Sequence, residues 1–294
     1  MSFEHWDEVR TAYQVARMGT VSGAAEVLGV HHATVIRHID ALEGRLGAKL
    51  FQRHARGYTP TEAGQDLLVV AASTDDQFTQ LVGRIKGRGN EVTGDLVVTS
   101  LGSISPLFVP AMAAFQKEHP DLTIRLLTDE RLFRLEYGEA HVAIRAGKAD
   151  DNPDNIVQPF FTQNMRLVAH ADYVAEYGLP DETNLDHHRF IGSAQDRSRA
   201  PFFRWMAEMV PESSIVYRTS DLRGMKDAVL AGIGIGFVAS WDRFGTEDLV
   251  EMLPPLEEWA SPLWLVTHMD SHRTAKVQTF LQFLKEQVKT WDLG

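Results

Sequence analysis

Apolar residues recur at helical spacing through the N-terminal part of the chain and at strand spacing through much of the remainder. Two short stripes have the helical period: Ala24, Ala25 and Leu28 form the first, and Val35, Ile36 or Ile39, and Leu42 form the second. Gly29 between them suits a left-handed turn, and Ser22 is placed to cap the first helix. The pattern predicts two short helices joined by a glycine turn, with the second beginning near His32. This is the shape of a helix-turn-helix that reads the major groove of DNA.

The polar face of the predicted second helix carries side chains that reach base edges and phosphates. A basic segment comes after it, which we interpret as a wing. The candidate DNA contacts on these two elements are His32, Thr34, Arg37, His38, Arg53 and Arg56. If the histidines among them, with His31, contact DNA, binding should change between about pH 6 and 8.

Charge is segregated along the chain. Residues 31–58 contain five Lys or Arg and two Asp or Glu, a net charge of +3 without histidines. Residues 91–294 contain 19 Lys or Arg and 30 Asp or Glu, which equals the −11 of the whole chain. The acidic total therefore hides a basic segment that coincides with the predicted DNA reader.

A long helix is predicted beyond Pro60, where the first domain ends. Its apolar positions run to about residue 86 and are Leu67, Leu68, Ala71, Phe78, Leu81, Val82 and Ile85. A glycine-rich break comes next, at residues 87–94. A small winged domain has little surface to cover this helix. The alternative is that it is simply the last helix of the N-terminal domain.

From residue 95 onward strands alternate with helices, which predicts parallel or mixed sheets covered by helices. The predicted strands are 96–100, 122–127, 141–145, 165–170, around 191, 215–217, 234–239 and 263–268. The predicted helices are 106–119, 221–231 and 274–291, the first with Ser105 as its cap and Pro106 in its first turn.

Composition excludes several classes of protein. The chain is 44% apolar and 23% charged, which is ordinary for a globular protein. It has no cysteine, so disulfides, thiol redox sensing and thiolate metal sites are excluded. No apolar run reaches the roughly 18 residues of a membrane span, and the acidic, aromatic N-terminus is unlike a signal peptide. We therefore expect a cytoplasmic protein without a membrane partner.

The chain resembles the LysR-type transcriptional regulators over nearly all of its length. The family's ordered N-terminal motif appears here as Ala24-Ala25, Leu28, Gly29, Arg37, Leu42-Glu43, Leu50-Phe51, Arg53 and Thr61-Glu62-Ala63-Gly64. Departures occur at Ala12, His31, Ile36 and His38, where the family usually has Phe, Ser, Ser and Gln. They bear on the operator sequence rather than on the fold.

The resemblance implies a multi-domain α/β fold. A winged helix-turn-helix is expected at residues 1–60, a dimerising linker helix at 61–90, and an effector-binding domain like type 2 periplasmic binding proteins at 91–294. Its first subdomain would contain residues 91–161 and 268–294, and its second 162–267. The implied partners are double-stranded promoter DNA, a small-molecule effector and further copies of the chain, as dimers or the tetramers usual in the family. RNA polymerase is a further candidate partner. No catalytic residue, metal or resident cofactor is expected.

Effector contacts are expected where strands end at the carboxyl edge of a sheet. The residues that the resemblance implies are Ser100, Ser103, Thr128 and Thr219, with Ser193 as a weaker fifth. Arg145 also ends a strand, and its guanidinium suits a carboxylate-bearing effector. Each has an alternative: Ser103 and Ser220 can be helix caps, and Arg145 can pair with Glu139 or Asp150.

Other signals give weaker predictions. Gly232-Ile233-Gly234-Ile235-Gly236 resembles a dinucleotide fingerprint, but here a helix precedes the glycines and a strand succeeds them, which is the wrong order. The adjacent pairs His31-His32 and His187-His188 diverge on any regular element and are unsuited to chelation.

Two other functions fit parts of the pattern. A solute-binding protein leaves residues 1–60 unexplained, and an α/β enzyme with a nucleic-acid domain needs a catalytic constellation that the sequence does not contain.

Overall fold

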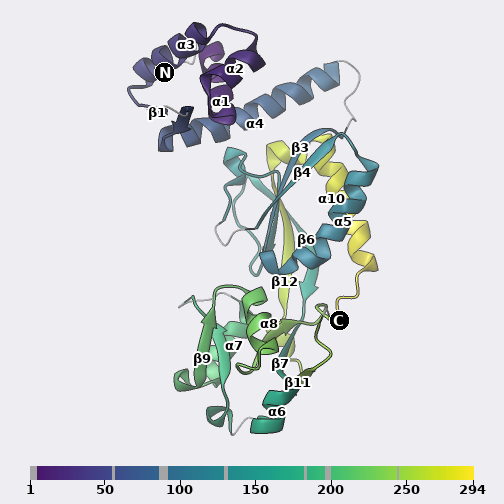
Figure 1. The fold of residues 1–294 in the computed structure, drawn as a ribbon. Coiled ribbons are helices and arrows are strands. Elements are labelled where there is room, and N and C mark those ends of the chain that lie inside the picture. Colours follow the sequence, from purple (N-terminus) through teal and green to yellow (C-terminus); the bar gives the residue numbers. More distant parts are fainter. Residues whose placement is uncertain are drawn as a thin grey trace. The chain divides into compact units, whose positions relative to one another are not determined.

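The computed structural model describes residues 5–54, 57–85, 92–128, 132–181, 184–195, 200–243 and 245–294. The chain divides into two compact units (Figure 1). The first comprises Met1–Glu91 with Arg134–Glu139, and the second comprises Val92–Phe133 with Ala140–Gly294. Among the helices in the described ranges, none is both long and apolar enough to cross a membrane.

The first unit contains the predicted helix-turn-helix, wing and long helix. Its elements are α1 (Trp6–Met18), α2 (Val21–Leu28), α3 (His32–Leu46), β1 (Phe51–His54), β2 (Gly57–Pro60) and α4 (Glu62–Ile85). The start of the second predicted helix at His32 is confirmed. Gly29 ends α2 with a φ of +66°, which confirms the predicted left-handed turn.

The core of the first unit is small and lies between α1, α2, α3 and the start of the hairpin. Val35, Ile39 and Leu42 face inward from α3, whereas Ile36 is 38% exposed. Of the two predicted alternatives, Ile36 or Ile39, Ile39 is therefore the core residue. The prediction that Ser22 caps α2 is wrong. The chain is still extended at Thr20, whose Oγ1 accepts a hydrogen bond from the Gly23 amide at 3.1 Å, and Ser22 lies inside the first turn.

The second unit contains two main sheets. The five-stranded sheet has the order β4-β3-β5-β12-β6, with β3 parallel to β4 and β5, and β12 antiparallel to β5 and β6. The mixed sheet predicted from the alternating pattern is thus confirmed. Its strands are β3 (Gly94–Ser100), β4 (Leu122–Thr128), β5 (Val142–Ala146), β6 (Asn155–Gln163) and β12 (Ser261–His268), and its helices are α5 (Ser105–Glu118), α9 (Met269–His272) and α10 (Ala275–Gln287).

The second sheet has the order β10-β7-β11, and β8 and β9 form a parallel pair beside it. The elements here are β7 (Met165–His170), α6 (Ala171–Tyr177), β8 (Phe190–Ser193), α7 (Pro201–Met209), β9 (Ile215–Thr219), α8 (Leu222–Leu230), β10 (Gly236–Ala239) and β11 (Leu249–Leu253). Short 3-10 turns complete the chain: η1 (Gly102–Ile104), η2 (Leu135–Tyr137), η3 (Leu185–His187), η4 (Glu212–Ser214), η5 (Glu257–Trp259) and η6 (Val288–Thr290), of which η2 belongs to the first unit.

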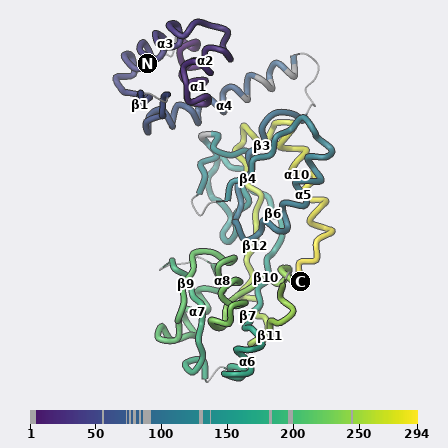
Figure 2. Tube along the Cα trace, in the orientation of Figure 1, coloured from purple at the N-terminus to yellow at the C-terminus, as the bar shows by residue number. Residues whose placement is uncertain are grey.

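The chain passes twice between these sheets, from β6 into β7 and from β11 into β12, as Figure 2 shows. This crossing corrects the predicted subdomain boundary after residue 267. Residues 261–267 belong to β12, which lies in the middle of the first sheet and not in the second subdomain.

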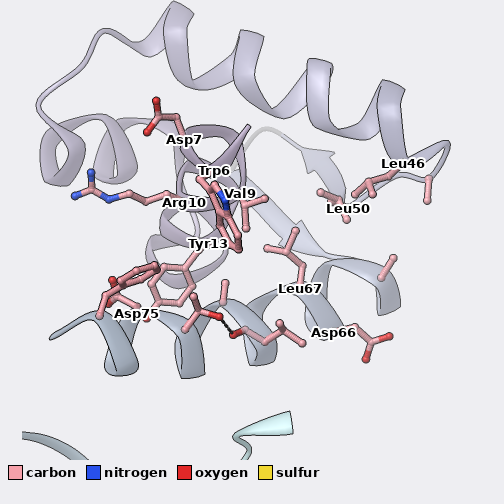
Figure 3. A pocket seen from close by; sticks show the side chains of 16 residues that line it. Trp6, Asp7, Val9, Arg10, Tyr13, Leu46, Leu50, Asp66, Leu67 and Asp75 are labelled. Carbon is pink, nitrogen blue, oxygen red and sulfur yellow. Dashed lines mark hydrogen bonds between the residues drawn. The ribbon is translucent and has the colours of Figure 1, made fainter. Parts of the chain in front are cut away.

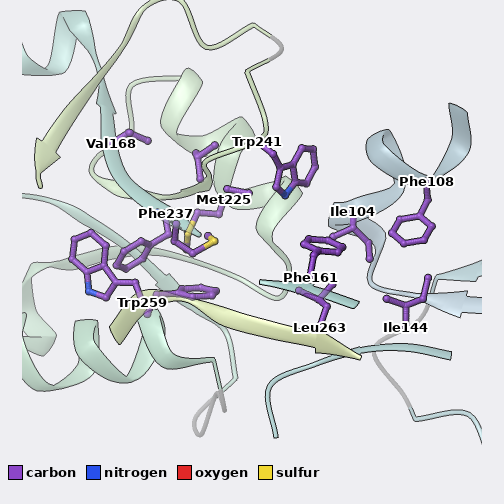
Figure 4. Packing of buried hydrophobic residues seen from close by; sticks show 14 of the residues in the cluster. Ile104, Phe108, Ile144, Phe161, Val168, Met225, Phe237, Trp241, Trp259 and Leu263 are labelled. Carbon is purple, nitrogen blue, oxygen red and sulfur yellow. Dashed lines mark hydrogen bonds between the residues drawn. The ribbon is translucent and has the colours of Figure 1, made fainter. Parts of the chain in front are cut away.

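One continuous apolar core runs through the second unit (Figure 4). Phe115 of α5 packs on Phe280 of α10 with ring centroids 5.1 Å apart, which fixes two helices over the first sheet. Phe237 of β10 packs on Trp259 at 5.0 Å beneath the second sheet. Because each fully buried aromatic side chain contributes on the order of 2 kcal/mol, this core is a large part of what holds the unit together.

The remaining differences from prediction have local causes. The strand β6 was not predicted, because Pro159 interrupts its pattern. A proline without an amide proton is tolerated there since β6 is an edge strand with a register shift. The predicted cap Ser105 is instead the first residue of α5, after η1, while Pro106 does occupy the first turn as predicted.

Candidate nucleic-acid interface and effector region

The outward face of α3 presents the predicted DNA contacts. His32 and Arg37 are exposed, and Thr34 and His38 are half-buried at the edge of the same face. Their neighbours Val35 and Ile39 are fully buried, which holds the helix to its core and fixes this face outward. In the part of the chain that the structure describes, no ion pair engages Arg37, so its guanidinium is available to an external acceptor.

His38 is held by α1. Its Nδ1 lies 2.9 Å from Thr11 Oγ1, and that hydroxyl donates its one proton to the Asp7 carbonyl at 2.6 Å. The Thr11 oxygen must therefore accept from Nδ1–H, which leaves Nε2 as the acceptor of the neutral ring.

A buried carboxylate connects α3 to the wing. The side chain of Glu43 is 2% exposed and accepts from the Leu50 amide at 3.0 Å, the Phe51 amide at 3.3 Å and Lys49 Nζ at 2.7 Å. Burial alone would raise the pKa of this carboxyl, but the hydrogen bonds from Lys49 and the two amides outweigh burial and lower the pKa below its ordinary value. Glu43 is therefore a fixed negative charge that anchors the strand β1.

Arg53 on β1 is oriented by the same cluster. Its Nη2 donates to Asp40 Oδ1 at 2.6 Å and to Glu43 Oε2 at 3.0 Å, and its guanidinium carbon lies 5.3 Å from the Tyr58 ring centroid. The hydrogen bond to Asp40 is the main reason that the pKa of Arg53 is raised. Arg53 remains 35% exposed, so it can still contact a phosphate, but much of its role is structural.

The wing is held tightly against the end of α1. The Tyr58 amide donates to the Gly19 carbonyl at 2.8 Å, and Gly57 has a φ of +140°. A Cβ at Gly57 would lie 2.3 Å from the Gly19 oxygen, so only glycine fits. The predicted contact Arg56 lies outside the described residues.

The Thr61-to-Gly64 motif joins α4 to this domain. Thr61 Oγ1 donates to the Lys49 carbonyl at 2.6 Å and accepts from the Gly64 amide at 3.2 Å. A Cβ at Gly64 would lie 2.0 Å from the Leu50 carbonyl oxygen. The spacing of this motif thus encodes a helix start that is pressed directly onto the backbone of the preceding chain.

An apolar groove of about 670 Å³ lies between α1 and α4, and the sequence did not predict it. Val9 and Tyr13 line it from α1, and Leu67 lines it from α4 (Figure 3). Val70 and Phe78 continue this lining along α4. Val70 is 51% exposed and Phe78 is 57% exposed. The apolar face beyond, through Leu81, Val82 and Ile85, is exposed as well, so the described residues of the first unit leave it uncovered.

In the second unit, four predicted effector residues come together in two pairs. Ser100 and Thr128 are register partners at the ends of the parallel strands β3 and β4. A Cβ at Gly102 would lie 3.8 Å from the Thr128 Cβ, so the loop carrying Ser103 turns back over this edge. Ser100 is buried, whereas Ser103 is half-buried and Thr128 is exposed, so the latter two are the more accessible hydroxyls.

The second pair is formed by Ser193 and Thr219, register partners at the ends of β8 and β9. Ser193 Oγ accepts from the Gln195 amide at 3.0 Å, and Thr219 lies against the first turn of α8. The predicted alternative that Ser220 caps this helix is wrong. Asp221 is the cap, accepting from the amides of residues 223 and 224 at 2.8 and 2.9 Å.

Arg145 is engaged inside the protein. It pairs with Asp150, as one of the predicted alternatives has it, and Nη2 donates to the Phe133 carbonyl at 3.0 Å. Asp150 also accepts from the Asn155 side chain at 3.0 Å and from the Asn152 amide at 3.0 Å. The network favours a structural role for Arg145, because both of its terminal nitrogens already donate to partners inside the protein.

The two units match known families. Residues 6–65 match the family described as "Bacterial regulatory helix-turn-helix protein, lysR family", and residues 89–289 match the "LysR substrate binding domain". An HTH-type transcriptional repressor of Pseudomonas aeruginosa is 26% identical over 94% of this chain and 90% of its own length. The regulator CrgA of Neisseria meningitidis serogroup B is 26% identical over 96% of both chains.

The structure of a full-length OxyR variant from Pseudomonas aeruginosa has a TM-score of 0.69. It covers 100% of this chain and 97% of its own, at 17% identity, so this likeness concerns the fold alone. A helix-turn-helix unit joined in one chain to a unit with two sheets is the architecture of a transcription regulator that carries its DNA-binding and sensor parts together. This chain belongs to the LysR family of transcriptional regulators, and it is a regulator and not an enzyme.

Proposed function

We propose that this regulator reads its operator with the outward face of α3 and the wing. His32, Thr34 and Arg37 would contact base edges, and Arg53 would contact the phosphate backbone. The observation that carries this proposal is the exposed Arg37 on a helix whose opposite face is fully buried. The guanidinium fork of arginine is the commonest partner of guanine in the major groove.

We propose further that a second copy of the chain covers the groove between α1 and α4. The groove is continuous with the exposed apolar positions of α4, which run from Val70 to Ile85 and span about four turns of helix in a chain of net charge −11. A helix face of that length repeats along its axis, so two copies can bury it reciprocally around a two-fold axis. Two recognition helices would then meet the two halves of a pseudo-palindromic site.

A small-molecule effector would act on the second unit. The support is the convergence of Ser100 with Thr128 and of Ser193 with Thr219 at the ends of two strand pairs. Hydroxyls at such ends are suited to orient a small polar ligand. An effector changes DNA binding only if it prefers one arrangement of the chain over another.

The test is fluorescence anisotropy of the full-length protein with the DNA upstream of its gene, against a scrambled duplex, over a salt series. We expect selective binding that weakens steeply with salt. Arg37→Ala should weaken binding to the operator by about tenfold or more, because a bidentate base contact is worth about 1–3 kcal/mol. The matched control is Arg223→Ala, which removes one exposed arginine from the second unit. Equal weak binding to both duplexes would contradict the proposal.

A further inference from the structure

Arg166 is a half-buried cation, and two of its nitrogens are buried with no acceptor among the described residues. It lies on β7, the central strand of the second sheet, within the otherwise apolar run Met165–Ala169. Its Nε and Nη2 are buried and make no hydrogen bond within the described ranges. Burying guanidinium nitrogens without an acceptor is costly, and the cost is avoided only if an acceptor is supplied. The residue keeps part of its surface exposed, so such an acceptor has access from outside.

The register of the sheet shows which way Arg166 leaves β7. Arg166 pairs with Val238 and Val168 pairs with Gly236 across the antiparallel strands, so these four residues share one face. A Cβ at Gly236 would meet Val229 and Met225 of α8 at 2.7 and 3.1 Å. The face that carries Arg166 is therefore the one covered by α8.

The direction of α8 then places Arg166 along the helix. A short connection joins the end of α8 to the start of β10, so the two run antiparallel, and Val238 is nearer the first turn of α8 than Gly236 is. The ion pair between Lys226 and Asp242, at 2.5 Å, agrees with this direction. The first turn of α8 is where Thr219 packs, and η1, which carries Ser103, also contacts α8. Arg166 thus lies on the sheet face covered by α8, toward the end of that helix where Thr219 packs.

A second unsatisfied donor lies at the same end of the strand. The indole Nε1 of Trp241, just beyond β10, is buried, and no described residue accepts its proton. Figure 4 shows Trp241 on the side of the core that faces Ile104, which ends η1. The unsatisfied atoms of Arg166 and Trp241 are all donors. The ligand that satisfies them must bring acceptors, and the guanidinium favours one that brings negative charge.

We propose that Arg166, and not Arg145, is the charged anchor of the effector site, and that the effector is a small organic carboxylate. This rests on the proposed effector function of the second unit and names its ligand class. The planar fork of arginine matches the two oxygens of a carboxylate, and the Trp241 indole offers one further unsatisfied donor. Both terminal nitrogens of Arg145 already have partners, in Asp150 and the Phe133 carbonyl.

The experiment uses the full-length protein and measures thermal unfolding and calorimetric binding with acetate, malonate, succinate and inorganic phosphate at constant ionic strength. Malonamide serves as the uncharged counterpart of malonate. At least one carboxylate should stabilise the wild-type protein saturably, whereas malonamide and phosphate should not. Arg166→Met should weaken that binding about tenfold or more, the expected loss for a hydrogen bond to a charged group. It should also raise the unfolding temperature of the ligand-free protein, because an unpaired buried charge is removed.

The matched control is Arg223→Met, an exposed arginine on α8 that removes the same charge nearby; it should change neither quantity. The proposal is wrong if Arg166→Met lowers the ligand-free unfolding temperature, if carboxylate affinity survives in that variant, or if no carboxylate acts on the wild-type protein. Phosphate binding that depends on Arg166 with no carboxylate binding would overturn the ligand class. DNA anisotropy on the same samples separates this result from the proposed function: selective DNA binding with no Arg166-dependent anion response overturns only the role of Arg166.

Discussion

Within the described residues, the first unit pairs its buried carboxylate Glu43 with cations and leaves an apolar helix face exposed, whereas the second unit has a continuous apolar core and leaves two guanidinium nitrogens without an acceptor. Arg53 has two carboxylates and an aromatic ring as neighbours, while Phe78 and Ile85 are exposed on α4. In the second unit a continuous core covers both sheets, and two guanidinium nitrogens of Arg166 meet no acceptor from the described chain. A large exposed apolar surface is typical of a site that binds another protein. A guanidinium whose buried nitrogens have no acceptor is suited to bind a small anion.

The largest effect is expected from charging the exposed face of α4. Phe78→Asp should dissociate the proposed dimer, because a carboxylate would be buried at the centre of the interface. Operator affinity should then fall by about 100-fold or more, since two linked recognition helices become one. Sedimentation measures the first effect and anisotropy the second. Gln77→Asp, an exposed neighbour that does not line the groove, adds the same charge and should leave the dimer intact. A dimeric Phe78→Asp protein would disprove this assignment.

A smaller effect is expected inside the first unit, from removing its buried anion. Glu43→Ala should destabilise this unit by about 3 kcal/mol, because two backbone amides and two cations lose a buried partner. Hydrogen exchange of the segment from Leu50 to His54 should accelerate, while exchange in β3 of the second unit stays unchanged. If exchange accelerates equally in both segments, the stabilising effect of Glu43 is not confined to the wing.

Arg145 allows a direct comparison with Arg166 within the second unit. Arg145→Met should lower the stability of this unit by about 2 kcal/mol, because a network of charged hydrogen bonds is broken. Arg166→Met is expected to have the opposite sign. Unfolding temperatures of the two variants, measured together without added carboxylate, test the contrast. Effects of the same sign would remove the distinction between a satisfied and an unsatisfied guanidinium.

The smallest effect is a pH dependence of the first unit. Because the pKa of Glu43 is lowered in the folded state, its contribution to stability is complete above the ordinary value of 4.5 and is lost as pH falls below that value. Glu43→Gln should therefore be less stable than wild type at pH 6, and the difference should narrow on acidification. Chemical denaturation from pH 6 to pH 3 measures it, and a constant difference would contradict the sign.

The elements with a long or strict period were predictable from sequence, and those fixed by a single contact were not. The apolar face of α4 and the glycine turn before α3 are set by spacing alone. Caps are not: Ser22 and Ser220 are good capping residues, but Thr20 and Asp221 accept the amides because the chain leaves the extended conformation there. Which of several adjacent polar residues caps a helix depends on backbone geometry that spacing does not carry.

The candidate effector site shows the same limit. Ser100 and Thr128 could be paired in advance because parallel strands end at one edge. Choosing between Arg145 and Arg166 required knowing the partners of each, which come from residues far apart in the chain. The sequence carried one unused signal, a basic residue inside the apolar strand run at 165–169.

The close approach of Gly64 to the Leu50 carbonyl has a mechanical consequence. With Thr61 bridging the Lys49 carbonyl and the Gly64 amide, the first turn of α4 is coupled rigidly to the DNA-reading domain. A rotation of α4 about its axis must therefore rotate α3 by the same angle. One residue inserted after Gly64 would rotate the rest of α4 by about 100° relative to the helix-turn-helix. The direction in which α3 faces would then change relative to the apolar face of α4. In the proposed dimer, the angle between the apolar face of α4 and the recognition helix α3 would thus be set by the number of residues between them.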